Sequence, residues 1–220
     1  MLTLAHLRDQ RGFTLAELMV ASGITMLVLG GAVALTSQVQ KGYTRQMEDA
    51  AAEQEGRYAL EWVSRLIRAA GNAPFPIAIS ACPEALTEYK AFYWDPDDDD
   101  LNDDLRIQSD SNPPDGLLGG LDGACNQGNE DVTVSYDPAT SSITFVDNNL
   151  GGGATIRTDA VIAGLLFIFR DVNHAVTTNE LNVVYVETQV TVRTRTIDPN
   201  TGAPATRVLS QEVRVRGRNF

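Results

Sequence analysis

The sequence has little histidine and little cysteine, the residue types on which many catalytic and metal sites depend. Its 220 residues include two of each, and two cysteines without nearby histidines lack the ligands of a zinc site. His6 lies in the polar start of the chain and His174 stands alone near Asp171, which favours a solvated histidine over a general base. The glycine run 151–153 lacks the following Lys-Ser/Thr of a phosphate-binding loop. We therefore expect a protein that is not an enzyme and requires no cofactor.

Positive charge is scarce in one segment only. The net charge is −12. The segment from Cys82 to Asp131 contains 14 acidic residues and two basic ones, Lys90 and Arg106. The rest of the chain is balanced, with 15 acidic and 15 basic residues. The acidity therefore belongs to one segment and does not describe the whole surface.

Five arginines near the end of the chain would form a basic stripe if the last two long strands pair. Such a stripe would contact DNA phosphates or the acidic segment of a neighbouring subunit. A solvated sheet face with cross-strand pairs is the favoured interpretation, so we do not expect nucleic acid among the partners. The five are Arg193, Arg195, Arg214, Arg216 and Arg218.

A long apolar run lies near the N-terminus. Phe13 to Leu35 comprise 23 residues, of which Glu17 alone is ionisable. As a helix they would span about 35 Å, enough for a bilayer core. A carboxylate in such a segment is costly unless it is paired, which makes it a functional hypothesis by default. We predict a polar leader at 1–12 and a transmembrane helix at 13–36, whose preceding arginines stay cytoplasmic.

The residues around this junction resemble the class III signal of type IV prepilins and pseudopilins. The order is Gly12-Phe13-Thr-Leu-x-Glu17. Ala32-Val-Ala34 could mimic a secretory cleavage site, but the apolar run is too long and Glu17 is misplaced for one. The resemblance implies cleavage between Gly12 and Phe13 by a prepilin peptidase, and N-methylation of Phe13. It also implies that Glu17 acts in assembly, by meeting the terminal amine of a neighbouring subunit.

The helical pattern continues after the apolar run. At 37–71 we predict an amphipathic helix half that ends at Gly71-Asn72-Ala-Pro. Residues 55–74 (EGRYALEWVSRLIRAAGNAP) and 213–220 (VRVRGRNF) are similar to PilW-type minor pilins. Minor pseudopilins of the GspJ type share much of this pattern and remain the alternative. The predicted core stripe is Met47, Ala51, Tyr58, Trp62, Leu66 and Ala70, widened by Ala59, Val63 and Ile67.

The rest of the chain is predicted to form strands after an acidic, loop-rich insertion at 72–131. Strands are expected at 132–137 and 142–147, joined as a hairpin, and at 184–196 and 207–216. The run 160–169 fits a buried strand, and a helix there is the alternative. The fold class is α+β and pilin-like, with the long helix packed on an antiparallel β head at 132–220.

Cys82 and Cys125 bracket the acidic segment in the part predicted to be exported. An oxidising periplasm favours a disulfide between them. Two unpaired thiols, one of them buried, are the alternative.

The acidic run 95–104 suggests calcium binding. Asp95, Asp97, Asp99 and Asp103 occupy positions one, three, five and nine of an EF-like loop. The pattern breaks where Asp100 replaces the turn glycine and Arg106 replaces the bidentate glutamate. A looser oxygen cage for Ca²⁺ is therefore the hypothesis, and a solvated acidic loop is the favoured alternative.

Together these features predict a minor type IV pilin, anchored in the inner membrane with a periplasmic head and then built into a pilus or its tip complex. Its expected partners are major and other minor pilins, the prepilin peptidase, the inner-membrane assembly platform, and the membrane before assembly. A minor pseudopilin of a type II secretion system is the first alternative. A DNA-uptake pilus subunit that binds DNA is the second.

Overall fold

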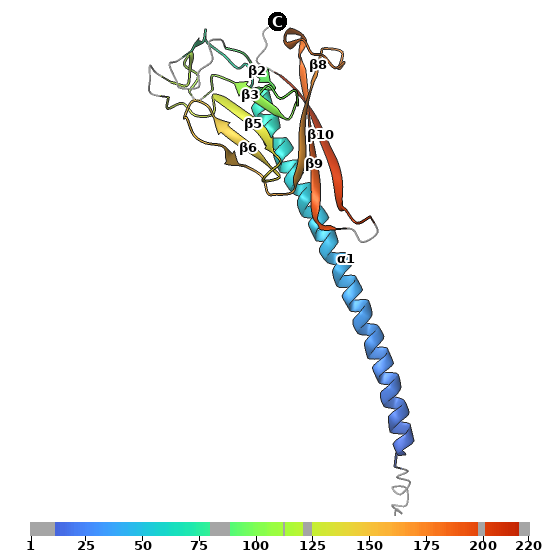
Figure 1. Ribbon diagram of the computed structural model, residues 1–220. Coiled ribbons are helices and arrows are strands. Elements are labelled where there is room, and N and C mark those ends of the chain that lie inside the picture. The colour runs from blue at the N-terminus through green and yellow to red at the C-terminus, as the bar shows by residue number, and fades with distance from the viewer. Residues whose placement is uncertain (1–11, 80–88, 112, 121–124, 198–200, 216–220) are drawn as a thin grey trace, which may run out of the picture. The chain divides into compact units, whose positions relative to one another are not determined.

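The computed structural model describes residues 12–79, 89–111, 113–120, 125–197 and 201–215. They form one long helix followed by short and long strands (Figure 1). A short 3₁₀ helix, Glu180–Asn182, precedes the last two strands. The elements are α1 (Leu15–Ala69), β1 (Ala78–Ile79), β2 (Phe92–Trp94), β3 (Asp104–Gln108), β4 (Leu117–Leu118), β5 (Asp131–Asp137), β6 (Ser142–Asp147), β7 (Thr155–Ile156), β8 (Ile162–Arg170), β9 (Tyr185–Ile197) and β10 (Pro204–Arg214).

The chain divides into two compact units, 1–47 and 48–220. The described part of the first unit consists of the start of α1 and the three residues before it. Every described residue from 12 to 41 is exposed. This part of α1 is long and apolar enough to cross a membrane, as the sequence predicts. An apolar surface that the chain leaves uncovered requires lipid or another protein around it.

The second unit begins within α1, where a buried face appears. Its small residues, Ala52, Gly56 and Ala59, let the helix approach the strands closely: a Cβ on Gly56 would lie 2.6 Å from Leu209 Cδ1. The helix ends where predicted, and Gly71, with a φ of 69°, donates its N–H to the Gln108 carbonyl at 2.8 Å. The buried residues of α1 are Ala52, Gly56, Ala59, Leu60, Val63, Ser64 and Ile67.

The predicted stripe on this helix is partly wrong. Ala51 is exposed, Met47 is 57% exposed and Tyr58 is 47% exposed. The buried face is shifted by about one residue from the predicted stripe. The reason is that the helix contacts the strands through its small side chains, while larger side chains lie at the edges of the contact. Trp62 lies at that flank, edge-on to Phe145 at a ring separation of 5.7 Å.

The strands form two principal sheets and one small one. The first sheet has the order β2-β3-β5-β6-β7 and the second has the order β10-β9-β8, and all of their pairings are antiparallel. β1 and β4 form a two-residue parallel pair. Both principal sheets and the second part of α1 contribute to one hydrophobic core. The α+β pilin-like fold class is confirmed, although the strands form more than one sheet.

Most predicted strands are present with small changes in their ends. β5 and β6 form the predicted hairpin, with Asp137 opposite Ser142. The run at 160–169 is the strand β8, and the helical alternative is wrong. The segment 72–131 also contributes strands that the sequence analysis did not place: β2 and β3 extend the first sheet beside β5. They are short and lie among turn residues, so their periodicity gives little signal.

Candidate assembly site

The predicted cleavage junction lies just before α1. Gly12 and Phe13 precede the helix, and Phe13 is 91% exposed. A Cβ added to Gly12 would meet no atom within 4 Å. The described structure therefore does not need glycine at position 12 for steric reasons. If a small residue is required there, the reason lies in a protein that binds this segment, such as a peptidase.

Thr14 and Glu17 form a reciprocal hydrogen-bonded cap at the start of α1. The Thr14 N–H and hydroxyl donate to Glu17 Oε2 at 2.9 and 3.0 Å, and the Glu17 N–H donates to the Thr14 hydroxyl at 3.2 Å. This is a capping box, which satisfies backbone donors that a helix start leaves open. The sequence analysis did not identify Thr14, although Thr-x-x-Glu at a helix start is a recognisable signal for it.

The cap fixes the direction of the Glu17 side chain without neutralising its charge. Hydrogen bonds from a threonine leave a net negative charge on the carboxylate. Among the residues that the structure describes, no cation pairs with Glu17, and nothing donates to its Oε1. Within hydrocarbon such a charge requires a cationic partner from outside the described chain.

Apolar side chains surround this carboxylate along the helix. Leu18, Met19 and Val20 are 67%, 66% and 62% exposed. Farther along, Ile24 is 58% and Leu29 60% exposed. This part of the helix presents an apolar surface, with the Glu17 carboxylate held in one direction at its N-terminal end. Such a surface can lie in lipid or pack against similar helices, where van der Waals contact and polar pairing drive association.

The comparisons with known proteins agree with this reading of the N-terminus. A family model described as the prokaryotic N-terminal methylation motif matches residues 7–33. This match supports a place for the chain in the type IV pilin and pseudopilin superfamily. A search of curated proteins finds no match, and a search of solved structures finds none either.

The methylation motif indicates which proteins the chain interacts with and how it is anchored. Proteins with this motif are structural subunits that interact with other pilins and with a prepilin peptidase. The apolar helix near the N-terminus fits a membrane-anchored pilin. The motif covers the anchor alone, so it says nothing about the head.

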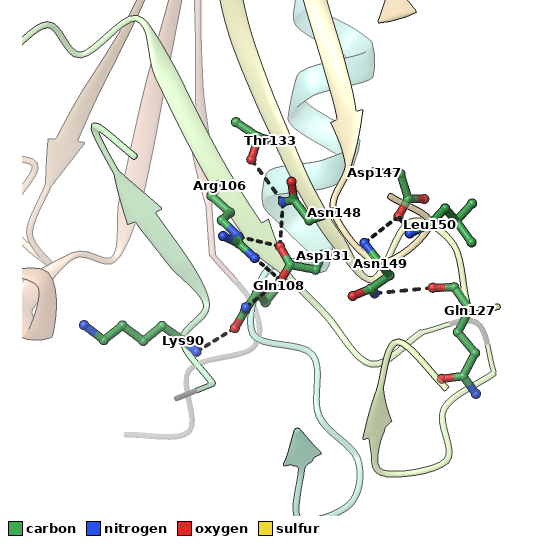
Figure 2. Close-up of polar contacts among 10 residues, drawn as sticks. All are labelled: Lys90, Arg106, Gln108, Gln127, Asp131, Thr133, Asp147, Asn148, Asn149 and Leu150. Carbon is green, nitrogen blue, oxygen red and sulfur yellow. Dashed lines mark hydrogen bonds and ion pairs between the residues drawn. The ribbon is translucent and has the colours of Figure 1, made fainter. Parts of the chain in front are cut away.

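Within the head, a buried carboxylate is fully paired by its own chain (Figure 2). Asp131 accepts hydrogen bonds from Arg106 on both oxygens, at 2.7 Å each. Gln108 donates to Oδ2 at 2.9 Å and Asn148 donates to Oδ1 at 2.9 Å. Gln108 also accepts the Lys90 N–H at 3.0 Å. The network joins β3, β5 and the turn after β6, and it stabilises the fold without an open coordination position.

The acidic loop gathers some of the predicted calcium ligands. Carboxylate oxygens of Asp95, Asp97 and Asp104 lie within 4.8 Å of one another. Asp99 and Asp103, which the EF-like pattern included, are not in this group. The Asp99 carboxylate accepts the Leu101 N–H at 2.8 Å. Asp104 opens β3. It belongs to the same acidic run, but the EF-like spacing selects Asp103 beside it and passes over Asp104.

The carboxyl groups of this loop raise one another's pKa. Burial and then the nearby charges of Asp97 and Asp103 together raise the pKa of Asp104 to about 7. Burial and the neighbouring Asp99 also raise the pKa of Asp97 and of Asp103. The loop therefore resists full ionisation unless a cation lies among its acids.

The predicted disulfide cannot be followed in the structure. Cys82 lies outside the described residues, and Cys125 lies in the half-buried turn before β5. The pairing of the two cysteines stays a prediction. Mass spectrometry of peptides under non-reducing conditions would test it.

The arginine stripe does not form among its described members. β9 and β10 pair as required, but Arg193 lies beside Thr206 while Arg214 lies beside Tyr185. Eight residues of strand separate these positions, or roughly 26 Å. The Arg193 guanidinium donates to Ser141 Oγ at 2.6 Å. Arg216 and Arg218 lie outside the described residues, as does the Arg195 side chain.

His174 has partners that the sequence analysis did not find. Its Nδ1 lies 2.7 Å from Glu212 Oε1, and its ring stacks on Tyr185 at 4.3 Å. Arg170 pairs with Glu187 and approaches Glu212 at 3.5 Å. Hydrogen bonds from Gln189 and then from Arg170 lower the pKa of Glu187. These charges compensate one another at the end of the β8-β9-β10 sheet, which fits a structural role for His174.

Proposed function

We propose that the chain is a minor type IV pilin of the PilW kind: a non-enzymatic subunit that is inserted in the inner membrane and then built into a pilus or its initiating tip complex. Prepilin peptidase cleaves it between Gly12 and Phe13, and Phe13 is then N-methylated. The anchor half of α1 becomes part of the filament core, and the periplasmic head makes contacts specific to this subunit. The assembly platform and other pilins are its partners.

The observation that carries this proposal is the oriented, uncompensated charge of Glu17. Cleavage would create a cationic amine on Phe13, one helical turn from the carboxylate. An incoming subunit's Glu17 would meet the Phe13 amine of a neighbour, and each group would neutralise a charge that is costly in hydrocarbon. The Thr14 cap supports this role because it holds the carboxylate in place before a neighbour arrives.

Charge removal at Glu17 tests the pairing. Glu17→Gln keeps an oxygen that can accept from Thr14 but removes the negative charge, and Glu17→Ala removes both. We expect both variants to reach the membrane at normal levels and to be depleted about tenfold or more from sheared filaments, measured by immunoblot. The matched control is Glu61→Ala, because Glu61 is 70% exposed on the same helix and, among the described residues, forms an exposed pair with Arg65. Normal incorporation of Glu17→Gln would contradict the pairing mechanism.

Leader removal is tested separately at Gly12. Gly12→Ser adds a side chain where no atom lies within 4 Å, so the fold should tolerate it. We expect an uncleaved precursor that migrates more slowly than the mature protein. A normally processed Gly12→Ser protein would argue against recognition by a prepilin peptidase.

A minor pseudopilin of the GspJ type is the alternative within the superfamily. The same pairing would then build a short secretion pseudopilus. Deletion of the gene separates the two: loss of surface pili supports the pilus assignment. Loss of protein secretion with normal pili would replace it.

A further inference from the structure

Three aspartates converge where the acidic loop meets the start of β3. We propose that Asp95, Asp97 and Asp104 bind one divalent cation, Ca²⁺ in the exported setting, and that the ion joins the loop to the first sheet. The proposal goes beyond assembly, because the residues lie in the head and not in the anchor. It also differs from the EF-like register, since Asp104 takes the place of Asp99 and Asp103.

The loop is held in a defined shape around Asp95. Asp95 Oδ1 accepts the Asp99 N–H and Oδ2 accepts the Asp100 N–H, both at 3.0 Å. The end of the loop is attached to both sheets: the Asn102 carbonyl accepts from Phe167 N–H at 2.7 Å, and the Asp103 carbonyl accepts from Tyr136 N–H at 3.1 Å. Backbone hydrogen bonds therefore hold the Asp95 carboxylate and the end of the loop in place.

Asp104 supplies the observation that points to a ligand. The residue is 4% exposed, and its Oδ1 is buried without a hydrogen-bond partner. Four side-chain atoms in the described part of the chain share this condition, and Asp104 Oδ1 is the single carboxylate oxygen among them. A buried carboxylate oxygen without a partner is strongly unfavourable. A cation held by the three aspartates would give this buried carboxylate a partner of opposite charge.

The charge around the site is not balanced by protein cations. Seven aspartates lie between 95 and 104, and none of them takes part in an ion pair with a described residue. Carboxylate oxygens are ligands of hard cations, which favours Ca²⁺ or Mg²⁺ over zinc. Within the described ranges, no protein cation has to be displaced for the ion to enter.

Coordination chemistry favours Ca²⁺ over Mg²⁺. Ca²⁺ binds oxygens at about 2.3–2.6 Å in a flexible geometry, whereas Mg²⁺ demands a near-ideal octahedron at about 2.0–2.1 Å and gives up its waters reluctantly. The oxygens of the three carboxylates are no more than 4.8 Å apart, which is close enough for one Ca²⁺ to contact all three. Water would complete the coordination of a three-carboxylate site.

Calcium titration of the full-length protein in detergent, by isothermal calorimetry, tests the site. We expect one ion per chain, with a Kd of roughly 0.1–1 mM as in other extracellular calcium modules. Asp97→Asn and Asp104→Asn should each weaken binding about tenfold or more. The matched control is Asp98→Asn, which removes the same charge from the same loop outside the cluster, and asparagine tolerates the φ of 60° at that position.

Thermal unfolding keeps the test interpretable if a variant folds poorly. Calcium at millimolar concentration should raise the Tm of the wild type and of Asp98→Asn, and leave Asp104→Asn unchanged. Without calcium, Asp104→Asn should be at least as stable as the wild type, because it removes a buried unpaired charge. Absence of heat at millimolar calcium, or wild-type affinity in Asp104→Asn, would overturn the proposal. Loss of binding in Asp99→Asn with retention in Asp104→Asn would restore the EF-like register instead.

Discussion

The two parts of α1 have the same secondary structure and opposite surroundings. From 15 to 41 every residue is exposed although most are apolar, whereas from 52 to 67 one face is buried against the strands. The later part packs against strands of its own chain. The apolar side chains of the earlier part can be covered only by lipid or by other subunits. The helix therefore has one part that belongs to the core of the head and one part that needs an apolar environment from outside the chain.

Two carboxylates, one in the head and one in the anchor, differ in whether their own chain supplies a charged partner. Asp131 is buried and receives four hydrogen bonds from Arg106, Gln108 and Asn148. Glu17 is capped by Thr14 and has no cationic partner within the described ranges. The head pairs its buried charge internally, whereas the charge of Glu17 in the anchor has no cationic partner among the described residues. Mutations should therefore separate stability of the head from assembly.

The largest effect on stability is expected from Asp131→Ala. It removes the buried carboxylate that pairs with Arg106, whose side chain is 12% exposed. Removing one partner of a buried ion pair typically destabilises by about 3–5 kcal/mol. Denaturant unfolding followed by tryptophan fluorescence would measure the loss. Glu61→Ala, which breaks an exposed pair, should change the free energy of unfolding by less than about 1 kcal/mol.

The same substitution on the two parts of the helix should have different results. Ile67 is 1% exposed, so Ile67→Ala should lower the free energy of head unfolding by about 2–5 kcal/mol. Ile24 is 58% exposed, and Ile24→Ala should leave head unfolding unchanged while reducing incorporation into filaments. Equal effects of both variants on head unfolding would break the comparison.

Glycines provide a smaller test of the same kind. Gly56→Ala would place a Cβ 2.6 Å from Leu209 Cδ1 and 2.7 Å from Val192 Cγ1, an overpacking that costs about 1–3 kcal/mol. Gly42→Ala meets no atom within 4 Å and gains helix propensity of up to about 1 kcal/mol. Circular dichroism during thermal unfolding would compare them. A stabilising Gly56→Ala would contradict the close approach of helix and strands.

The smallest effect concerns the pH dependence of the head. The pKa of Glu187 is lowered from its ordinary 4.5 by Gln189 and Arg170. Its contribution to stability is therefore present above about pH 4.5 and is lost as the pH falls below that value. The stability difference between wild type and Glu187→Gln should shrink by about 1 kcal/mol between roughly pH 6 and pH 3. A difference that stays constant would show that the contact with Arg170 contributes nothing.

The sequence predicts the anchor better than the head, for a physical reason. The motif that contains Gly12, Phe13 and Glu17 is defined by local spacing, and β5, β6 and β9 follow from the alternation of their side chains, so neighbouring residues suffice to find them. The buried face of α1 depends on which side chains let strands approach, and the predicted stripe was displaced. The burial of Asp104 depends on the sheet that it enters, and the partners of Asp131 come from segments 17 to 25 residues away. No local pattern specifies those contacts.

The most direct test of the account is intact-mass and N-terminal peptide analysis of the protein purified from its native membrane or filaments. The central claim is that the exposed apolar helix is kept and begins with a charged amine near Glu17. The account predicts a chain that starts at Phe13, carries one methyl group on that nitrogen and retains the whole of α1. A chain that still carries residues 1–12 in the filament, or one from which the apolar helix has been removed, would contradict it.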